Sequence, residues 1–154
     1  MKHLQFKRII SVLLTIAMLL TMVPATFAAS ASDFTDFPTG WSKEAMAFSV
    51  DNGLLNGKSA NRIEPAANLT RAEMAAIINR AFGAKVTADI SGYSDVNPSD
   101  WFYVEMQKAV NMQTFNGDGN GRLRPNDAIT REEVMAVIAR AMDLEQPDYS
   151  PLNK

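Results

Sequence analysis

Apolar positions recur with helical spacing in two segments that lie sixty residues apart. In each segment they fall at i, i+3, i+4, i+7 and i+8, which is the spacing of one stripe along an amphipathic helix. The stripes consist of Met74, Ile77, Ile78, Ala81 and Phe82 in the first segment, and of Val134, Val137, Ile138, Ala141 and Met142 in the second.

The two segments belong to a longer tandem repeat. Residues 41–82 align with residues 101–142 without a gap, and 14 of those 42 positions are identical. Each copy begins with a predicted helix, from Trp41 to about Asn52 and from Trp101 to about Met112, continues through a loop, and ends with the amphipathic helix. Repeats of this kind bury their apolar faces against their neighbours. We therefore predict an all-α fold of two helix-loop-helix units.

Glycine and proline mark the ends of these elements. Gly53 suits the left-handed position after the first helix, whereas Gln113 occupies the equivalent place in the second copy and leaves that helix end less well defined. Each loop ends in an apolar residue, a variable residue and a proline. Because the residue before proline avoids the helical region, both stretches are predicted to be extended. They are Ile63-Glu64-Pro65 and Leu123-Arg124-Pro125.

The first residues of the chain have the features of a secretory signal peptide. A basic leader precedes a nearly uninterrupted apolar run, residues 9–23, and small residues follow Pro24. We assign residues 1–28 to the signal, with cleavage after Ala28 or Ala31. The alternative is a retained membrane anchor, but the run is short of the roughly 20 residues that a spanning helix needs. No integral membrane span is expected after signal removal.

Composition restricts the chemistry that remains. All 17 acids follow the signal, which itself holds three of the 15 basic residues, so the remainder carries a net charge of −5. That charge argues against nucleic-acid binding. The chain has no cysteine, and its single histidine, His3, leaves with the signal. Ser-His or Cys-His nucleophiles and typical zinc sites are thereby excluded, and we expect no cofactor.

A Thr-Arg-x-Glu motif opens each amphipathic helix. Threonine and glutamate have the spacing of a capping box, which accounts for Thr70, Glu73, Thr130 and Glu133 on structural grounds. The arginines, Arg71 and Arg131, would lie at the positive end of the helix dipole, where a cation is disfavoured. Two explanations stay open: each arginine pairs with an acid, such as Glu64, Asp127 or a carboxylate of the other repeat, or it joins free helix-terminal amides in an anion pocket.

Other repeated or loop residues have competing interpretations. Trp41 and Trp101 are interpreted either as core residues or hydrophobic staples, or as flat faces for a sugar ring. An EF-hand-like spacing of Asn116, Asp118, Asn120, Gly121 and Asp127 suggests calcium, but the first position is Asn, the last is Asp, and Pro125 interrupts the loop. We interpret this loop as ordinary turns and predict no metal site.

Taken together, these motifs resemble the S-layer homology (SLH) domain. The family pattern is an aromatic-x-Asp opening, a tryptophan, a helix, a glycine-rich loop, an apolar-x-Pro stretch and Ile-Thr-Arg-Ala-Glu. The first copy matches with Phe34-Thr35-Asp36, Trp41, Gly53, Gly57, Ile63-Glu64-Pro65 and Leu69-Thr70-Arg71-Ala72-Glu73. The second matches with Tyr93-Ser94-Asp95, Trp101, Gly117, Leu123-Arg124-Pro125 and Ile129-Thr130-Arg131-Glu132-Glu133.

The resemblance implies a secreted protein held without a covalent bond at the bacterial cell wall or S-layer. Its partner would be secondary cell-wall polysaccharide linked to peptidoglycan, often carrying a pyruvate ketal on an N-acetylmannosamine unit, bound in grooves between repeats. The implied ligand-binding residues are Arg71, Arg131, Trp41, Trp101, Gly57 and Gly117, and Asp36 and Asp95 are the repeat-opening acids. Glu132, where the pattern has alanine, adds a negative charge beside Arg131.

The family usually has three repeats about a pseudo-three-fold axis, and two are found here. We assign the first repeat to residues 33–83, a linker to 84–92, the second repeat to 93–143, and a tail resembling the lead-in to a third repeat to 144–154. Either the chain is a fragment, or another SLH chain completes the set of three. The alternative function is the anchoring fragment of a larger S-layer lattice protein or surface polysaccharide hydrolase. Glu73 and Glu133 could form a glycosidase pair, but capping already explains both, so we predict no enzymatic activity in these residues.

Overall fold

The computed structural model describes residues 29–144, so the predicted signal peptide and tail residues 145–154 lie outside the described part. It contains a short 3-10 helix, η1 (Ala31–Asp33), and four α-helices: α2 (Lys43–Asp51), α3 (Arg71–Phe82), α4 (Tyr103–Asn111) and α5 (Arg131–Ala141). Between residues 29 and 144, β-structure is confined to isolated bridges, so the predicted all-α class is confirmed. In this stretch, none of the helices has both the length and the hydropathy needed to cross a bilayer.

The two copies end their helices alike despite sequence differences. Gly53 follows α2 with a φ of 68°, and Gln113 follows α4 with a φ of 59°. The N–H of each donates to a carbonyl three residues earlier, at 2.8 Å and 3.0 Å. Gln113 therefore adopts the left-handed conformation that glycine takes at lower cost, and the second copy keeps the helix end of the first.

Both capping boxes are present. Thr70 Oγ1 accepts from the Glu73 N–H at 3.2 Å, and the Thr70 N–H donates to Glu73 Oε2 at 2.8 Å. Thr130 and Glu133 repeat this geometry at 3.2 Å and 2.9 Å. These bonds satisfy N–H groups that a helix start leaves without intrahelical partners.

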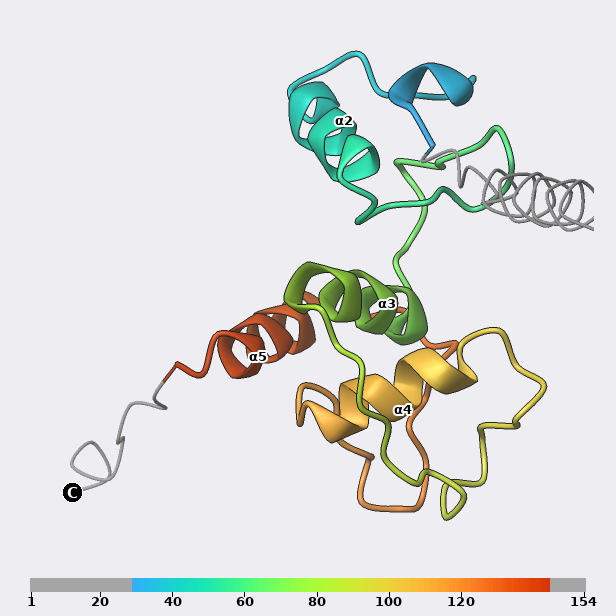
Figure 1. The fold of residues 1–154 in the computed structure, drawn as a ribbon, viewed down its shortest axis with the longest axis vertical. Coiled ribbons are helices and arrows are strands. Elements are labelled where there is room, and N and C mark those ends of the chain that lie inside the picture. Colours follow the sequence, from blue (N-terminus) through green and yellow to red (C-terminus); the bar gives the residue numbers. More distant parts are fainter. Residues whose placement is uncertain (1–28, 145–154) are drawn as a thin grey trace, which may run out of the picture.

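Helices of different repeats form the main packing unit (Figure 1). α3, from the first repeat, packs along α4, from the second, and also contacts α5. By contrast, α2 makes its helix contact with η1 and none with α3, the second helix of its own repeat. The repeat that is continuous in sequence is thus not the unit that packs together, as expected for repeats that bury their faces against neighbours.

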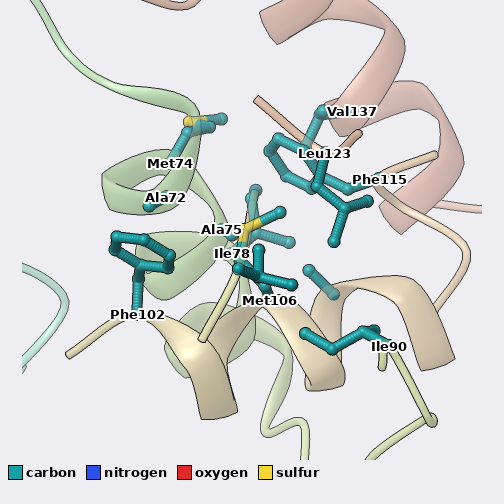
Figure 2. Close-up of a cluster of buried hydrophobic side chains, with 12 residues drawn as sticks. Ala72, Met74, Ala75, Ile78, Ile90, Phe102, Met106, Phe115, Leu123 and Val137 are labelled. Carbon is teal, nitrogen blue, oxygen red and sulfur yellow. The ribbon is translucent and has the colours of Figure 1, made fainter. Parts of the chain in front are cut away.

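The larger hydrophobic core lies at the junction of the repeats (Figure 2). Burying each large apolar side chain there contributes on the order of 1.5–3 kcal/mol. The linker, residues 84–92, also contributes, because Ile90 is fully buried and the Ala88 N–H donates to the Gln107 carbonyl at 3.1 Å. The buried residues are Ala72, Met74, Ala75, Ile78, Ile90, Val96, Phe102, Met106, Ala109, Phe115, Leu123 and Val137.

A second, smaller core supports α2. Its buried members are Phe34, Val50 and Ile63, with Phe37, Met46 and Leu55 partly buried against them. Phe48, on the same helix, is exposed. The first helix of repeat 1 therefore rests on a small core formed by its own repeat.

The prediction of an extended stretch before each proline is wrong for the middle residue. Glu64 and Arg124 have φ values of 52° and 54°, in the left-handed region. The cause is an acid that binds consecutive N–H groups. Asp36 accepts from Ile63 and Glu64 at 2.9 Å each, and Asp95 accepts from Leu123 and Arg124 at 2.9 Å and 2.7 Å. The repeat-opening acids thus hold the chain turn that leads to the second helix of each repeat.

Candidate functional site

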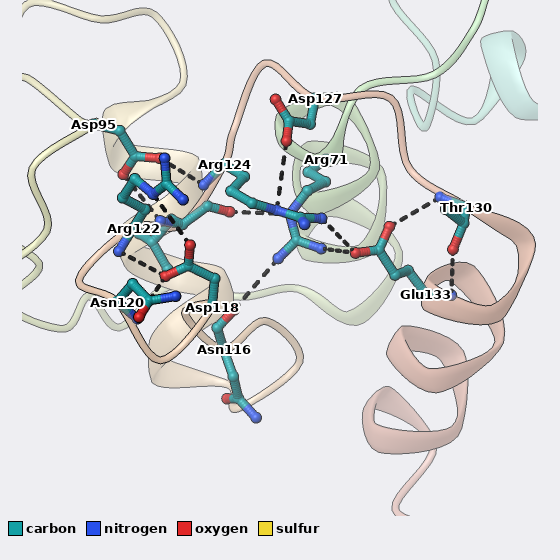
Figure 3. Close-up of polar contacts among 11 residues, drawn as sticks. Arg71, Asp95, Asn116, Asp118, Asn120, Arg122, Arg124, Asp127, Thr130 and Glu133 are labelled. Atoms are coloured by element: carbon teal, nitrogen blue, oxygen red, sulfur yellow. Dashed lines mark hydrogen bonds and ion pairs between the residues drawn. The ribbon is translucent and has the colours of Figure 1, made fainter.

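Arg71 lies at the centre of the junction between the repeats (Figure 3). It is the first residue of α3, yet only 8% of its surface is exposed. Its guanidinium donates from Nε to the Leu123 carbonyl at 2.9 Å, from Nη1 to Glu133 Oε1 at 2.8 Å, and from Nη2 to the Asn116 carbonyl at 3.3 Å. The charge also lies 5.3 Å from the centre of the Phe115 ring. An arginine of the first repeat is therefore bound by the second repeat on every side, through charge-assisted and cation–π contacts.

Backbone N–H groups at the start of α3 are also bound by the second repeat. The N–H groups of Arg71 and Ala72 donate to the carbonyls of Asp127 and Pro125, at 3.0 Å and 2.9 Å. One of the two explanations left open for Arg71 required such groups to be free for an anion. For these two N–H groups of α3 that explanation does not hold, because the neighbouring repeat supplies backbone acceptors to the positive end of the helix.

One carboxylate oxygen of Glu133 accepts hydrogen bonds from two arginines. Arg124 Nη2 lies 2.8 Å from Glu133 Oε1, the atom that also accepts from Arg71. Burial on its own would raise the pKa of Glu133, but the Thr130 N–H and the charges of Arg71 and Arg124 together lower it below its ordinary value. Burial lowers the pKa of Arg71, and the negative charge of Glu133 opposes that effect. Glu133 is consequently ionised at neutral pH.

A pocket with a volume of about 240 Å³ opens beside this ion pair, and we call it the junction pocket. Three arginines line it: Arg71, Arg124 and Arg140. Of its two acids, Glu133 is shared by two arginines, and Asp118 is held by Arg122, whose Nε lies 3.1 Å away. The remaining lining residues are Thr114, Phe115, Asn116, Gly117, Ala136 and Val137. Positive charge therefore exceeds negative charge in this pocket.

The first repeat carries a larger pocket of about 700 Å³, which we call the first-repeat pocket. Nine of the eleven residues of the junction pocket have equivalents sixty positions earlier in its lining. Here Glu73 pairs with Lys58, whose Nζ lies 2.9 Å from Oε1. Burial would raise the pKa of Glu73, but the Thr70 N–H and Lys58 lower it. Among the residues that the structure describes, no arginine occupies the place that Arg71 fills in the other pocket.

Arg131 is placed differently from Arg71. It begins α5 at the equivalent position, but its side chain is exposed. Within residues 29–144 its guanidinium makes no ion pair of 4.0 Å or less. The two explanations left open by the sequence thus divide between the copies: Arg71 pairs with an acid of the other repeat, and Arg131 is accessible to a partner.

The tryptophans are on the surface. Trp41 is 96% exposed and Trp101 is 63% exposed, so the interpretation as core residues is wrong for both. Trp101 contacts Phe102 edge to face, with ring centres 5.6 Å apart, and lines the first-repeat pocket. An exposed indole face beside a pocket is suited to stacking on a sugar ring.

The glycines predicted to bind ligand have a packing role. A Cβ on Gly57 would collide with the ring of Phe34, and one on Gly117 would lie 2.6 Å from Tyr93 Cε1. The aromatic residue that opens each repeat therefore packs directly on the loop glycine. Both glycines also line the pockets, Gly57 the first-repeat pocket and Gly117 the junction pocket.

Several pocket residues were not selected as site residues from the sequence. Arg80 and Arg140 are identical at equivalent positions of the two copies, and each donates to a loop carbonyl of its own repeat, Leu54 at 3.0 Å and Thr114 at 3.3 Å. That identity was a usable signal. Arg124 and Lys58 differ between the copies, so the repeat alignment gave no indication of their role.

The calcium-like loop is held by its own side chains. Asp118 accepts from the N–H groups of Asn120 and Arg122 at 2.8 Å and 3.2 Å. These bonds, the Asn120 N–H first, lower the pKa of Asp118. In the described chain no cluster of three or more acidic residues has the arrangement of a metal site.

Comparison with known proteins agrees with the motifs. The model of the S-layer homology domain matches residues 33–75 and 92–135. Among curated proteins, the chain is 31% identical over 127 residues to the exoglucanase XynX of Acetivibrio thermocellus, covering 82% of this chain and 12% of that protein. It is 33% identical over 117 residues to endo-1,4-beta-xylanase A of Thermoanaerobacterium saccharolyticum, covering 76% and 10%.

A surface-layer protein gives a similar match. The surface-layer 125 kDa protein of Lysinibacillus sphaericus is 30% identical over 124 residues, covering 80% of this chain and 10% of that protein. The chain thus spans about a tenth of the length of these relatives. Two family matches cover more than half of the chain, in the same two copies that form the junction. The chain therefore belongs to the S-layer homology domain family, whose repeats anchor surface proteins to the cell wall.

Proposed function

We propose that this chain anchors an exported protein by binding an anionic secondary cell-wall polysaccharide in the junction pocket. The observation that carries the proposal is the convergence of Arg71, Arg124 and Arg140 on one small pocket. A carboxylate on a sugar, such as a pyruvate ketal, would compensate their excess charge, and arginine binds carboxylates through paired N–H donors.

Geometry supports Arg124 as the ligand-facing arginine. Its side chain is 37% exposed, whereas that of Arg71 is 9% exposed and fully engaged by the second repeat. Arg71 would then act by fixing Glu133 and the pocket wall, and Arg124 would exchange part of its contact with Glu133 for the ligand. The volume of about 240 Å³ suits the acidic end of one sugar and not a long oligosaccharide.

The test is retention of the purified chain on cell-wall sacculi. We expect retention on intact sacculi, release by added wall polysaccharide, and loss of retention after chemical removal of pyruvyl groups. Equal binding to stripped and intact walls would refute the carboxylate mechanism.

A matched pair of variants tests the residue assignment. Arg124→Ala should reduce retention about ten-fold or more, because it removes one charge-assisted contact. Glu64→Ala changes the equivalent left-handed position in the first repeat and should not reduce it. Equal retention of both variants would exclude Arg124 from the site.

We also propose that these residues do not catalyse hydrolysis. A glycosidase needs one carboxylic acid that stays protonated and a second group that is ionised. Glu73 and Glu133 both have lowered pKa values, and each is held by a capping box and a cation. The pair therefore lacks a proton donor. Incubating the chain with cell-wall polysaccharide should release no reducing ends.

The protein to which such an anchor belongs is a separate question. The relatives include polysaccharide hydrolases and surface-layer proteins. Both the lattice-protein and the hydrolase alternatives remain predictions, and reading the gene on both sides of the chain would decide between them.

A further inference from the structure

The junction between the repeats has two complementary halves, and each half occurs once more in the chain. One half is the start of α3, with Arg71 and the apolar face behind it. The other is the receiving surface of repeat 2, formed by the Asn116 and Leu123 carbonyls and Glu133. The start of α5 repeats the first half, and the first-repeat pocket repeats the second.

The receiving surface of repeat 1 retains the acceptors that hold Arg71 in repeat 2. The Asn56 and Ile63 carbonyls stand where Asn116 and Leu123 stand, and Glu73 stands where Glu133 stands. Glu73 is fixed in the same capping geometry as Glu133. The pocket is nevertheless about 700 Å³ against about 240 Å³ for the junction pocket, which an inserted arginine and helix start partly fill.

The charges of the two pockets also indicate that the first-repeat pocket lacks an arginine. The junction pocket is lined by three arginines and two acids, Asp118 and Glu133. The first-repeat pocket has two bases, Lys58 and Arg80, and two acids, Glu64 and Glu73. The first-repeat pocket therefore has one basic residue fewer than the junction pocket. Since Glu133 accepts two cations, Glu73 can keep Lys58 and take one more.

The start of α5 has what that pocket lacks. Arg131 is exposed, and so is Met135 behind it, at 65%. The equivalent of Met135 in α3 is Ala75, which the junction buries completely. The face of α5 that corresponds to the packed face of α3 therefore still presents apolar surface to solvent in a single copy.

Two apolar residues of the junction are replaced by polar residues at the equivalent positions of the unpaired halves, one on each half. Ala72 of α3 and Phe102, at the start of α4, are apolar members of the buried junction core. Their equivalents on the unpaired halves are Glu132 and Ser42, both polar. If the two unpaired halves pack as the junction does, Glu132 faces the polar Ser42 and is not buried against an aromatic ring.

We propose that a second copy of this chain inserts the start of its α5 into the first-repeat pocket, with Arg131 bound by Glu73 and by the Asn56 and Ile63 carbonyls. The N–H groups of Arg131 and Glu132 then donate to the Ala67 and Pro65 carbonyls, as Arg71 and Ala72 do at the junction. The contact is head to tail, so copies assemble into a ring or an open chain according to the rotation between them. It does not depend on the polysaccharide.

Sedimentation velocity of the purified chain without polysaccharide is the first test. From about 1 µM to about 1 mM, the range of weak protein association, we expect the sedimentation coefficient to rise with concentration. Arg131→Ala and Glu73→Gln should each weaken association about ten-fold or more. Arg62→Ala, which removes an exposed arginine outside the pocket lining, should leave it unchanged. A wild-type chain that stays monomeric overturns the proposal, as does an Arg131→Ala variant that associates as strongly as wild type.

Disulfide cross-linking tests the register independently, since the chain has no cysteine of its own. Thr70 and Ala128 form an antiparallel bridge across the junction, a spacing that a disulfide can span. The equivalent pair between two copies is Thr130 of one and Asn68 of the other. Mixing Thr130→Cys with Asn68→Cys chains should give a disulfide-linked heterodimer. Mixing Thr130→Cys with Ser91→Cys chains is the mismatched control, and equal yields in the two mixtures overturn the proposed register.

Discussion

Arg71 of the first repeat and Glu133 of the second are joined at 2.8 Å, 62 positions apart in the chain. Both belong to copies of the same Thr-Arg-x-Glu motif. The threonine and glutamate of each copy cap their own helix, and the arginine of one copy binds the glutamate of the next. The motif therefore serves local helix initiation and recognition between neighbouring repeats at once, which explains a cation at a helix start that electrostatics alone would disfavour.

Replacing Arg71 should cost far more stability than replacing its repeat equivalent. Arg71→Ala removes three hydrogen bonds and leaves Glu133 with one cation in a partly buried site. We expect the free energy of unfolding to fall by about 2–4 kcal/mol. Arg131→Ala, at low protein concentration, should change it by less than about 0.5 kcal/mol, because that side chain is exposed. Urea denaturation followed by circular dichroism measures both, and equal losses would contradict the assignment of Arg71 to the junction.

Acid should weaken the junction. The pKa values of Glu133 and Glu73 are lowered in the folded chain from an ordinary value of 4.5. Since a lowered pKa means that the folded state binds the proton less readily than the unfolded state, the stabilisation is present above pH 4.5. It is lost as the pH falls through the folded values. We expect urea midpoints to drop in that acidic range, with a shallower dependence in Glu133→Gln. A midpoint that rises on acidification would contradict the lowered pKa values.

The loop glycines provide a test of packing without charge. Gly117→Ala places a Cβ 2.6 Å from the Tyr93 ring, and the loop or the ring must move. We expect a loss of about 1–3 kcal/mol in the free energy of unfolding. Gly92→Ala is the matched control, because a methyl group added there would have nothing within 4 Å of it, and it should be neutral within about 1 kcal/mol. Thermal unfolding of the two variants side by side distinguishes a packing role from general loop sensitivity.

The sequence predicted much of the local structure because the relevant signals are local. Capping boxes, the end of α2 shortly before Gly53, and the helical period of the apolar stripes each depend on residues a few positions apart. The prediction failed where a distant partner decides the outcome. Glu64 and Arg124 are left-handed before proline because Asp36 and Asp95 bind their N–H groups from about 28 positions away.

The site was less predictable for the same reason. The apolar period correctly places Met74 and Ile78 on the buried face of α3, but Ala81 and Phe82 of the predicted stripe are exposed. The period also does not identify the partner, and α3 buries Ala72, Ala75 and Asn79 as well because α4 comes from the next repeat. An arginine at a helix start is ordinarily exposed, so its burial follows only from the acceptors that repeat 2 supplies. Trp41 differs in the opposite sense: a place in the core was one of its two interpretations, and the structure leaves it on the surface.

Exposed tryptophans should contribute to wall binding without contributing to stability. Trp41 is 96% exposed, so Trp41→Ala should change the free energy of unfolding by less than about 0.5 kcal/mol. If the indole stacks on a sugar ring, the same variant should lose about three-fold to ten-fold in retention on sacculi, since such contacts are worth on the order of 1 kcal/mol. Phe48→Ala, which removes an exposed aromatic side chain of α2, is the control and should retain wild-type binding. A Trp41→Ala variant with wild-type retention would show that this indole makes no contact with the polysaccharide, and Trp101 would then be the tryptophan left to test by the same assay.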